Sequence, residues 1–162
     1  SPLHLAAAYA AIANGGVMIK PTLLKRDGAT TGVRVMSEET AAESVKMLRR
    51  VVVEGTATLG EVPGYEVAGK TGTADKTKKT GGYYDDKVIN TFAAMFPASN
   101  PQYVLIVTLD EPQDDTLSQT RRTAGWTAVP VAAEIIRRVA PLMGLRPKLE
   151  PVAVDAVTAA SN

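Results

Sequence analysis

The stretch Gly64-Tyr-Glu-Val-Ala-Gly-Lys-Thr-Gly-Thr73 decides how this chain is interpreted, because its lysine belongs to two incompatible patterns. Residues 64–71 satisfy G-x-x-x-x-G-K-[ST], the pattern of a loop that cradles nucleotide phosphates. Farther along, the apolar segment 104–109 ends at Asp110-Glu111, where a nucleotide hydrolase would place a carboxylate for magnesium. A P-loop nucleotide hydrolase is therefore one candidate.

The residues after the lysine argue against that candidate. A phosphate-binding loop needs a helix that begins directly after its Lys-Thr pair, because the free N–H groups of that helix hold the anion. Residues 72–87 include three glycines, and no apolar residue larger than Ala74 precedes Tyr83 to form a buried helix face. We therefore expect a strand here and keep the nucleotide hydrolase as a disfavoured alternative.

As a strand, the segment has a different chemistry. Side chains alternate along a strand, so Lys70 and Gly72 share one face while Thr71 and Thr73 point to the other. At a sheet edge, such a segment binds an extended peptide through its main chain and offers two hydroxyls and an ammonium to a carboxylate. Gly72 leaves room beside Lys70 for a close approach. A plain surface strand ending in a threonine-rich turn fits the spacing equally well.

Length and composition exclude several classes of protein. The chain has 162 residues, which is enough for one domain, and 45% of them are hydrophobic, as in globular proteins. Lys and Arg number 18 against 17 Asp and Glu, so charge gives no case for nucleic acid or an anionic membrane. With no cysteine and one histidine, His4 in an expected helix start, we predict no metal site and no cofactor.

The hydrophobic pattern predicts an α+β fold, with helices packed on an antiparallel sheet. The segment 98–102 joins two expected strands and is short enough only for antiparallel neighbours. Residues 75–88 are polar and rich in glycine, so we expect a surface loop there. The expected elements are helices over 2–14, 38–55 and about 126–144, short irregular strands within 17–36, and strands over 65–74, 91–97 and 103–109.

Lys70-Thr71-Gly72-Thr73 resembles the K-T-G element of penicillin-recognising serine transpeptidases. The resemblance to a class B penicillin-binding protein also includes the first sixteen residues, Gly55-Thr-Ala-Thr58 and the segment 92–99. Asp110-Glu111-Pro112 favours the cell-division type. About residues 1–145 are covered, which implies the C-terminal portion of a transpeptidase domain with a partial β-lactamase/transpeptidase-like fold. Residues 146–162 contain two prolines and no helical spacing, so we expect a mobile C-terminal tail.

This resemblance implies a peptidoglycan D,D-transpeptidase, which cross-links stem peptides through a serine acyl-enzyme and is acylated by β-lactams. Lys70 would set the electrostatics near the nucleophile, and the Thr71 and Thr73 hydroxyls would hold a carboxylate. The Thr73 N–H would be an oxyanion-hole donor, and Gly72 would permit the close approach. Division-machinery partners are implied as well. So is an anchor in the cytoplasmic (inner) membrane, with the catalytic domain in the periplasm or outside the cell.

Two elements of the resembled family are absent from this sequence. No serine is followed three residues later by lysine, and none begins an S-x-N pattern. We therefore expect this chain to be a fragment that is not acylated alone, and that self-associates through apolar surface on Tyr9, Ile12 and the sheet faces. Two further alternatives stay open, an inactive penicillin- or peptide-binding sensor module and a relative of β-lactamases or D,D-carboxypeptidases.

Overall fold

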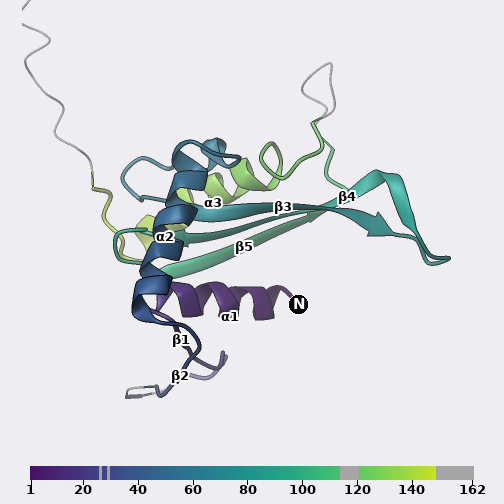
Figure 1. The fold of residues 1–162 in the computed structure, drawn as a ribbon. Coiled ribbons are helices and arrows are strands. Elements are labelled where there is room, and N and C mark those ends of the chain that lie inside the picture. Colours follow the sequence, from purple (N-terminus) through teal and green to yellow (C-terminus); the bar gives the residue numbers. More distant parts are fainter. Residues whose placement is uncertain (26, 29, 114–120, 149–162) are drawn as a thin grey trace, which may run out of the picture.

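A three-stranded antiparallel sheet forms the centre of the fold, with helices on both of its faces (Figure 1). Its strands are β3 (Ala68–Thr77), β4 (Tyr83–Phe96) and β5 (Tyr103–Asp110), in the order β3-β4-β5. The computed structural model describes residues 1–25, 27–28, 30–113 and 121–148. This arrangement confirms the predicted α+β class.

The helices lie close to where their end signals predict them. Helix α1 (Pro2–Ala13) has Pro2 in its first turn. Helix α2 (Glu38–Val53) is capped by Ser37, whose hydroxyl accepts a hydrogen bond of 3.1 Å from the Thr40 N–H. Helix α3 (Ala128–Leu142) follows, and the short 3-10 helix η1 (Thr58–Gly60) comes after α2. Helix α1 packs on one face of the sheet, and α3 with η1 covers the other (Figure 1).

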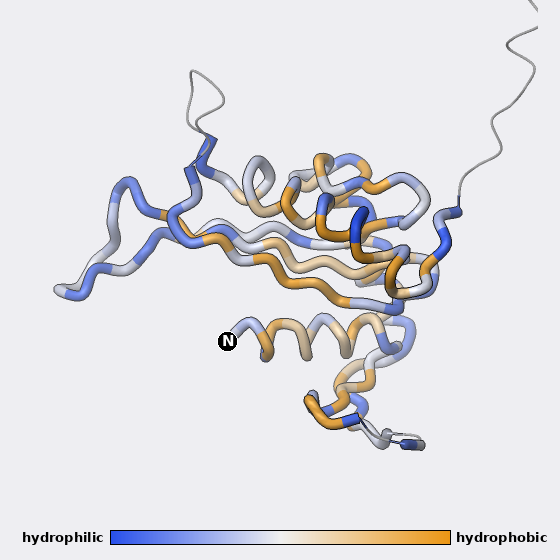
Figure 2. The backbone as a smooth tube through the Cα atoms, turned by 180° about the vertical axis from the view of Figure 1, so that it is seen from behind, coloured by the Kyte–Doolittle hydropathy of each residue, from blue (hydrophilic) through white to orange (hydrophobic). Residues whose placement is uncertain are grey.

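The main hydrophobic core lies between the sheet and α3. Alternate residues of β4 point toward it, and Phe92 is fully buried there against Val129 and Ile136 of α3. The opposite set of β4 residues includes the buried Met95 and faces the side that α1 covers. Hydrophobic residues accordingly run through the middle of the sheet, whereas the far end of β3 and β4 is hydrophilic (Figure 2).

The prediction of a surface loop over residues 75–88 is wrong. Strand β3 continues to Thr77 and β4 begins at Tyr83, so the two strands form a long hairpin that projects beyond the rest of the sheet (Figure 1). Only residues 78–82 turn, and the Lys78 N–H donates to the Gly82 carbonyl at 2.9 Å. Gly81 and Gly82 adopt φ of 92° and 77°, values that glycine takes without strain. At its other end β3 begins three residues later than predicted, at Ala68.

Two further features complete the fold. Strands β1 (Val17–Met18) and β2 (Val33–Arg34) pair antiparallel in a separate ribbon, which confirms short strands in that region. Beyond α3, the Lys148 N–H donates to the Gly64 carbonyl at 2.9 Å. Most of the predicted tail, residues 149–162, lies outside the described residues. Within the part of the chain that is described, no helix is both long and apolar enough to cross a membrane.

Candidate functional site

The Lys70–Thr73 segment lies in the middle of β3, at an edge of the sheet. Among the described residues β3 pairs only with β4, so its second hydrogen-bonding edge carries no strand. The backbone stays extended to Thr77, and no helix begins after Lys70. The G-x-x-x-x-G-K-[ST] pattern therefore does not form a phosphate-binding loop, and the nucleotide hydrolase alternative is not supported.

A cleft of about 390 Å³ opens beside this strand, on the face that α3 covers. Thr71 and Thr73 form one wall. The second wall comes from the turn after α2, and the third from the segment before α3. The lining residues are Gly55, Thr56, Thr58, Leu59, Thr71, Thr73, Thr123, Ala124, Gly125 and Trp126. Hydroxyl groups and one exposed indole thus surround a space large enough for part of a peptide.

The Thr71 hydroxyl lies in a small polar cluster at the edge strand. Its Oγ1 is 2.8 Å from Thr56 Oγ1, across the cleft wall. Lys70 Nζ donates to the Thr71 carbonyl at 3.0 Å and to Thr71 Oγ1 at 3.4 Å. The lysine side chain starts on the opposite face of the strand, and these two contacts show that its ammonium bends back along the strand toward Thr71. A positive charge therefore lies beside the hydroxyls.

Thr73 is held by the segment that precedes α3. Its Oγ1 accepts a hydrogen bond of 3.0 Å from the Ala124 N–H. A threonine hydroxyl has one proton to donate, and accepting this bond leaves that proton available. Because Thr73 is exposed and lines the cleft, its proton is available to an acceptor that binds there. A carboxylate is such an acceptor, and hydrogen bonds to charged groups are the stronger ones.

The structure separates the four predicted site residues into two groups. Thr71 and Thr73 line the cleft together, whereas Lys70 reaches it only through its contact with Thr71, and Gly72 does not line it. A Cβ atom on Gly72 would meet nothing closer than the Thr91 carbonyl at 3.9 Å, so the described chain leaves open space beside it. Sequence reasoning gave no role to Thr56 or Ala124, because their contacts with β3 join residues far apart in the chain.

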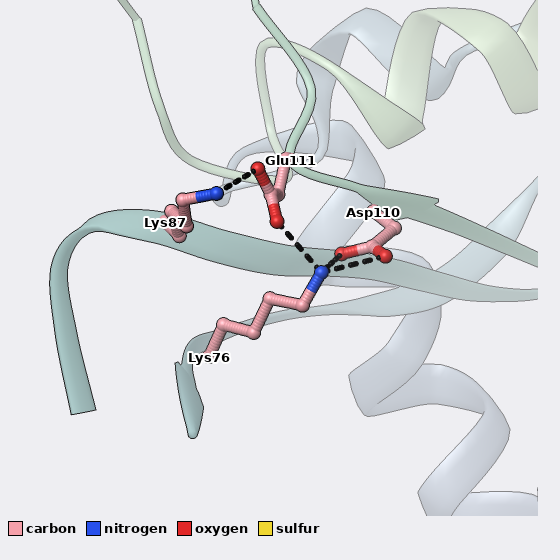
Figure 3. A network of polar contacts seen from close by, with 4 residues as sticks. All are labelled: Lys76, Lys87, Asp110 and Glu111. Atoms are coloured by element: carbon pink, nitrogen blue, oxygen red, sulfur yellow. Dashed lines mark hydrogen bonds and ion pairs between the residues drawn. The ribbon is translucent and has the colours of Figure 1, made fainter. Parts of the chain in front are cut away.

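A second polar cluster lies at the base of the projecting hairpin (Figure 3). Lys76 Nζ is 2.8 Å from Asp110 Oδ1 and 2.7 Å from Glu111 Oε1, and Lys87 Nζ is 2.8 Å from Glu111 Oε2. The hydrogen bonds that Lys76 donates to Asp110, and then to Glu111, raise its pKa to about 12. Hydrogen bonds from Lys76 and then Lys87 lower the pKa of Glu111. Asp110 therefore pairs with a lysine and does not serve as the magnesium ligand of a nucleotide site.

The described residues offer no candidate metal centre. No group of three or more His, Asp or Glu side chains lies together in that part of the chain. His4 is at the start of α1, where its Nδ1 lies 3.2 Å from the Ser1 hydroxyl.

Comparison with known proteins matches this chain to the transpeptidase domains of penicillin-binding proteins. The family model for the penicillin-binding protein transpeptidase domain matches residues 1–137. The chain is 39% identical, over 164 aligned positions, to a protein named probable peptidoglycan D,D-transpeptidase FtsI from Caulobacter vibrioides. That alignment covers 95% of this chain and 28% of the relative. The chain thus spans less than a third of the length of the curated relatives it matches.

Solved structures agree with the sequence matches. The apo transpeptidase domain of penicillin-binding protein 3 from Burkholderia pseudomallei superimposes with a TM-score of 0.81 at 35% identity, over 93% of this chain and 44% of that one. Penicillin-binding protein 3 from Mycobacterium tuberculosis, complexed with ampicillin, gives a TM-score of 0.77 at 30% identity, over 93% of this chain and 36% of that one. This chain therefore has the same overall fold as the corresponding part of the matched domains.

Proposed function

The chain belongs to the penicillin-binding protein transpeptidase family, and from this membership we propose that it forms the C-terminal portion of the catalytic domain of a peptidoglycan D,D-transpeptidase. In this proposal residues 1–145 form one wall of the active site, and residues 146–162 follow it as a tail. The serine nucleophile and its lysine belong to a part of the protein outside this sequence, which contains no S-x-x-K pattern. The reaction is cross-linking of stem peptides through an acyl-serine.

One observation carries this proposal, the pair of threonine hydroxyls at an edge strand beside a lysine ammonium. The Thr73 proton is free to donate because its oxygen already accepts from Ala124, and the ammonium of Lys70 lies beside the Thr71 hydroxyl. Two hydroxyl donors and a nearby positive charge suit the terminal carboxylate of a D-alanyl peptide or the carboxylate of a β-lactam. The main chain of β3 is available to align the ligand as an added strand.

The roles follow the matched K-T-G-T pattern residue by residue. Thr71 and Thr73 bind the carboxylate, and the Thr73 N–H is one of the two oxyanion-hole donors. Lys70 supplies positive charge near the nucleophile, and Gly72 keeps space beside the strand for the ligand. No cofactor takes part, because acyl transfer to serine needs only a nucleophile, a base and an oxyanion hole.

Cellular setting and partners form a further part of the proposal. The matched relative from Caulobacter vibrioides is named after the division protein FtsI, which supports a role in septal cell-wall synthesis with division-machinery partners. Peptidoglycan stem peptides lie outside the cytoplasmic membrane, so we place this domain in the periplasm or outside the cell, anchored to the inner membrane. We place the anchor outside this sequence.

Labelling with a fluorescent penicillin tests the proposal. The full-length protein that carries this chain should give a covalent band on denaturing gel electrophoresis, and benzylpenicillin should compete for it. Replacing Thr71 and Thr73 together by valine, which keeps the side-chain shape, should weaken labelling about a hundredfold, because each lost hydrogen bond to a carboxylate contributes about tenfold. The 162-residue chain alone should give no band. Absence of labelling in the full-length protein would favour the inactive sensor module instead.

A further inference from the structure

Asn90 of β4 is a buried polar residue directly behind the proposed carboxylate site. It is 0% exposed, and in the described residues only Thr127 is another polar residue in the buried class. Asn90 is the cross-strand partner of Thr73 in the β3-β4 register, so both side chains lie on the face that α3 covers. Burying an amide among apolar side chains is costly unless it is hydrogen-bonded. The Nδ2 of Asn90 is hydrogen-bonded, whereas its Oδ1 has no hydrogen-bond partner among the described residues, so the bonds of Nδ2 indicate its role.

The amide of Asn90 holds the segment that precedes α3. Its Nδ2 donates to the Arg122 carbonyl at 2.7 Å and to Thr127 Oγ1 at 2.7 Å. Because Thr127 Oγ1 accepts from Asn90, the Thr127 hydroxyl proton must point away from Asn90. The Thr127 hydroxyl donates this proton to the Thr123 carbonyl at 3.2 Å. The direction of this second bond is thus set by the first.

The Thr123 carbonyl and the Ala124 N–H belong to the same planar peptide unit. The carbonyl end of that unit accepts from Thr127 at 3.2 Å and from the Trp126 N–H at 3.0 Å, and the other end donates to Thr73 Oγ1 at 3.0 Å. Restraining the carbonyl therefore restrains the N–H that fixes the Thr73 oxygen. Each group along this path accepts one hydrogen bond and donates the next, and such chains strengthen their members by polarisation.

We propose that Asn90 is a positioning residue for ligand binding, at the start of a directional hydrogen-bond chain that runs through Thr127 and the Thr123-Ala124 peptide to Thr73. The chain ends with the Thr73 proton directed into the cleft, so its function is to present a donor to the carboxylate of a peptide or β-lactam. This inference rests on the proposed function, because it names the residue that orients the proposed carboxylate ligand.

Thr127 offers the sharpest test, because valine matches its shape and serine keeps its hydroxyl. In the full-length protein, Thr127→Val should slow acylation by benzylpenicillin by up to about tenfold, the effect of losing the hydrogen bond from Thr73 to the ligand carboxylate. Acylation by benzylpenicillin methyl ester, which lacks the charge, should change by less than about twofold. Thr127→Ser should restore the rate with both ligands. Equal losses with the acid and the ester in Thr127→Val would overturn the proposal.

Asn90→Asp adds a variant with the same shape and the opposite hydrogen-bonding direction. A carboxyl group at this position keeps its own proton for the Arg122 carbonyl and accepts the Thr127 proton, which takes that proton away from the Thr123 carbonyl. We expect the same selective loss with benzylpenicillin as in Thr127→Val. Thr91→Val is the matched control, because Thr91 lies next to Asn90 on the opposite face and bonds Thr108 at 3.2 Å. This control should leave both rates unchanged, and a selective loss in it would count against the proposal.

Hydrogen exchange of the Ala124 amide separates failure of this inference from failure of the proposed function. If penicillin does not acylate the wild-type protein, the proposed function fails. The hydrogen-bond chain would still predict faster Ala124 exchange in Thr127→Val than in Thr127→Ser. Faster Ala124 exchange in Thr127→Val, with an unchanged melting temperature, supports the hydrogen-bond chain whatever ligand the cleft binds. Equal exchange rates of the Ala124 amide in Thr127→Val and Thr127→Ser would overturn the proposed hydrogen-bond chain. This comparison remains valid if Asn90→Asp fails to fold.

Discussion

Replacing Gly69 by alanine tests how tightly β3 is held against the core directly before Lys70. A Cβ atom on Gly69 would lie 2.5 Å from the Ala93 carbonyl oxygen and 2.8 Å from the Phe92 ring. The first obstacle is the backbone of the paired strand, and the second is a fully buried side chain, so neither has room to move aside. Gly69 is therefore the β3 glycine that the fold itself requires.

The size of the effect follows from two opposing terms. Overpacking a filled core costs about 2–3 kcal/mol, whereas alanine in a strand gains about 0.5–1 kcal/mol over glycine in backbone entropy. The free energy of unfolding should fall by about 1–2.5 kcal/mol, which lowers the melting temperature of a chain of this length by about 2–10 °C. Gly72→Ala is the matched control, because its Cβ would meet only the Thr91 carbonyl at 3.9 Å. It should raise the melting temperature by about 1–4 °C.

Thermal unfolding followed by circular dichroism measures both variants, and the fluorescence of Trp126, the only tryptophan of the chain, reports on the cleft wall in the same samples. A Gly69→Ala variant as stable as the wild type would refute the packing argument. Equal destabilisation by the two substitutions would refute it too, because the argument depends on the different space around the two glycines.

Three further predictions concern stability and association. Glu111 has a lowered pKa, so its contribution to stability is present above its unfolded pKa of about 4.3 and is lost as the pH falls through its lower folded pKa. Glu111→Gln should therefore flatten the dependence of the urea midpoint on pH in this range. Phe92→Ala should cost about 3–5 kcal/mol of unfolding free energy in urea titrations, since the ring is fully buried. The isolated chain should gain apparent mass with concentration in light scattering, and Leu3→Glu should reduce this, because Leu3 is 62% exposed on α1; a constant monomer mass would contradict it.

Local signals made the helices and much of the sheet predictable from sequence. Ser37 caps α2 directly before the helix expected from residue 38, because a cap depends on residues three apart in the chain. The strands expected over residues 91–97 and 103–109 match the inner parts of β4 and β5, and they contribute Phe92 and Val107 to the core. The end of the hairpin was missed for the complementary reason. Lys76 finds its partners at Asp110 and Glu111, and ion pairs across such separations leave no periodic signal in the sequence.

The residues of the candidate site also divide into those that the local sequence predicts and those that only the tertiary structure places. Thr71 and Thr73 could be assigned to one face from strand alternation alone, and both line the cleft. Thr56 and Ala124 could not be assigned, because their places depend on how the turn after α2 and the segment before α3 meet β3. Asn90 gave even less signal, since a polar residue inside an apolar strand segment has no meaning until the register sets it opposite Thr73.

The two interpretations of Lys70 differ finally in which backbone groups are free. In a phosphate-binding loop, successive N–H groups point at one anion, because no strand partner uses them. In β3 the groups on one side pair with β4, so only alternate groups along the open edge remain available to a ligand. An edge of this kind aligns an extended chain, and it cannot surround a phosphate. The charge of the ligand must then be met by side chains, which explains why hydroxyls and an ammonium are placed along this edge.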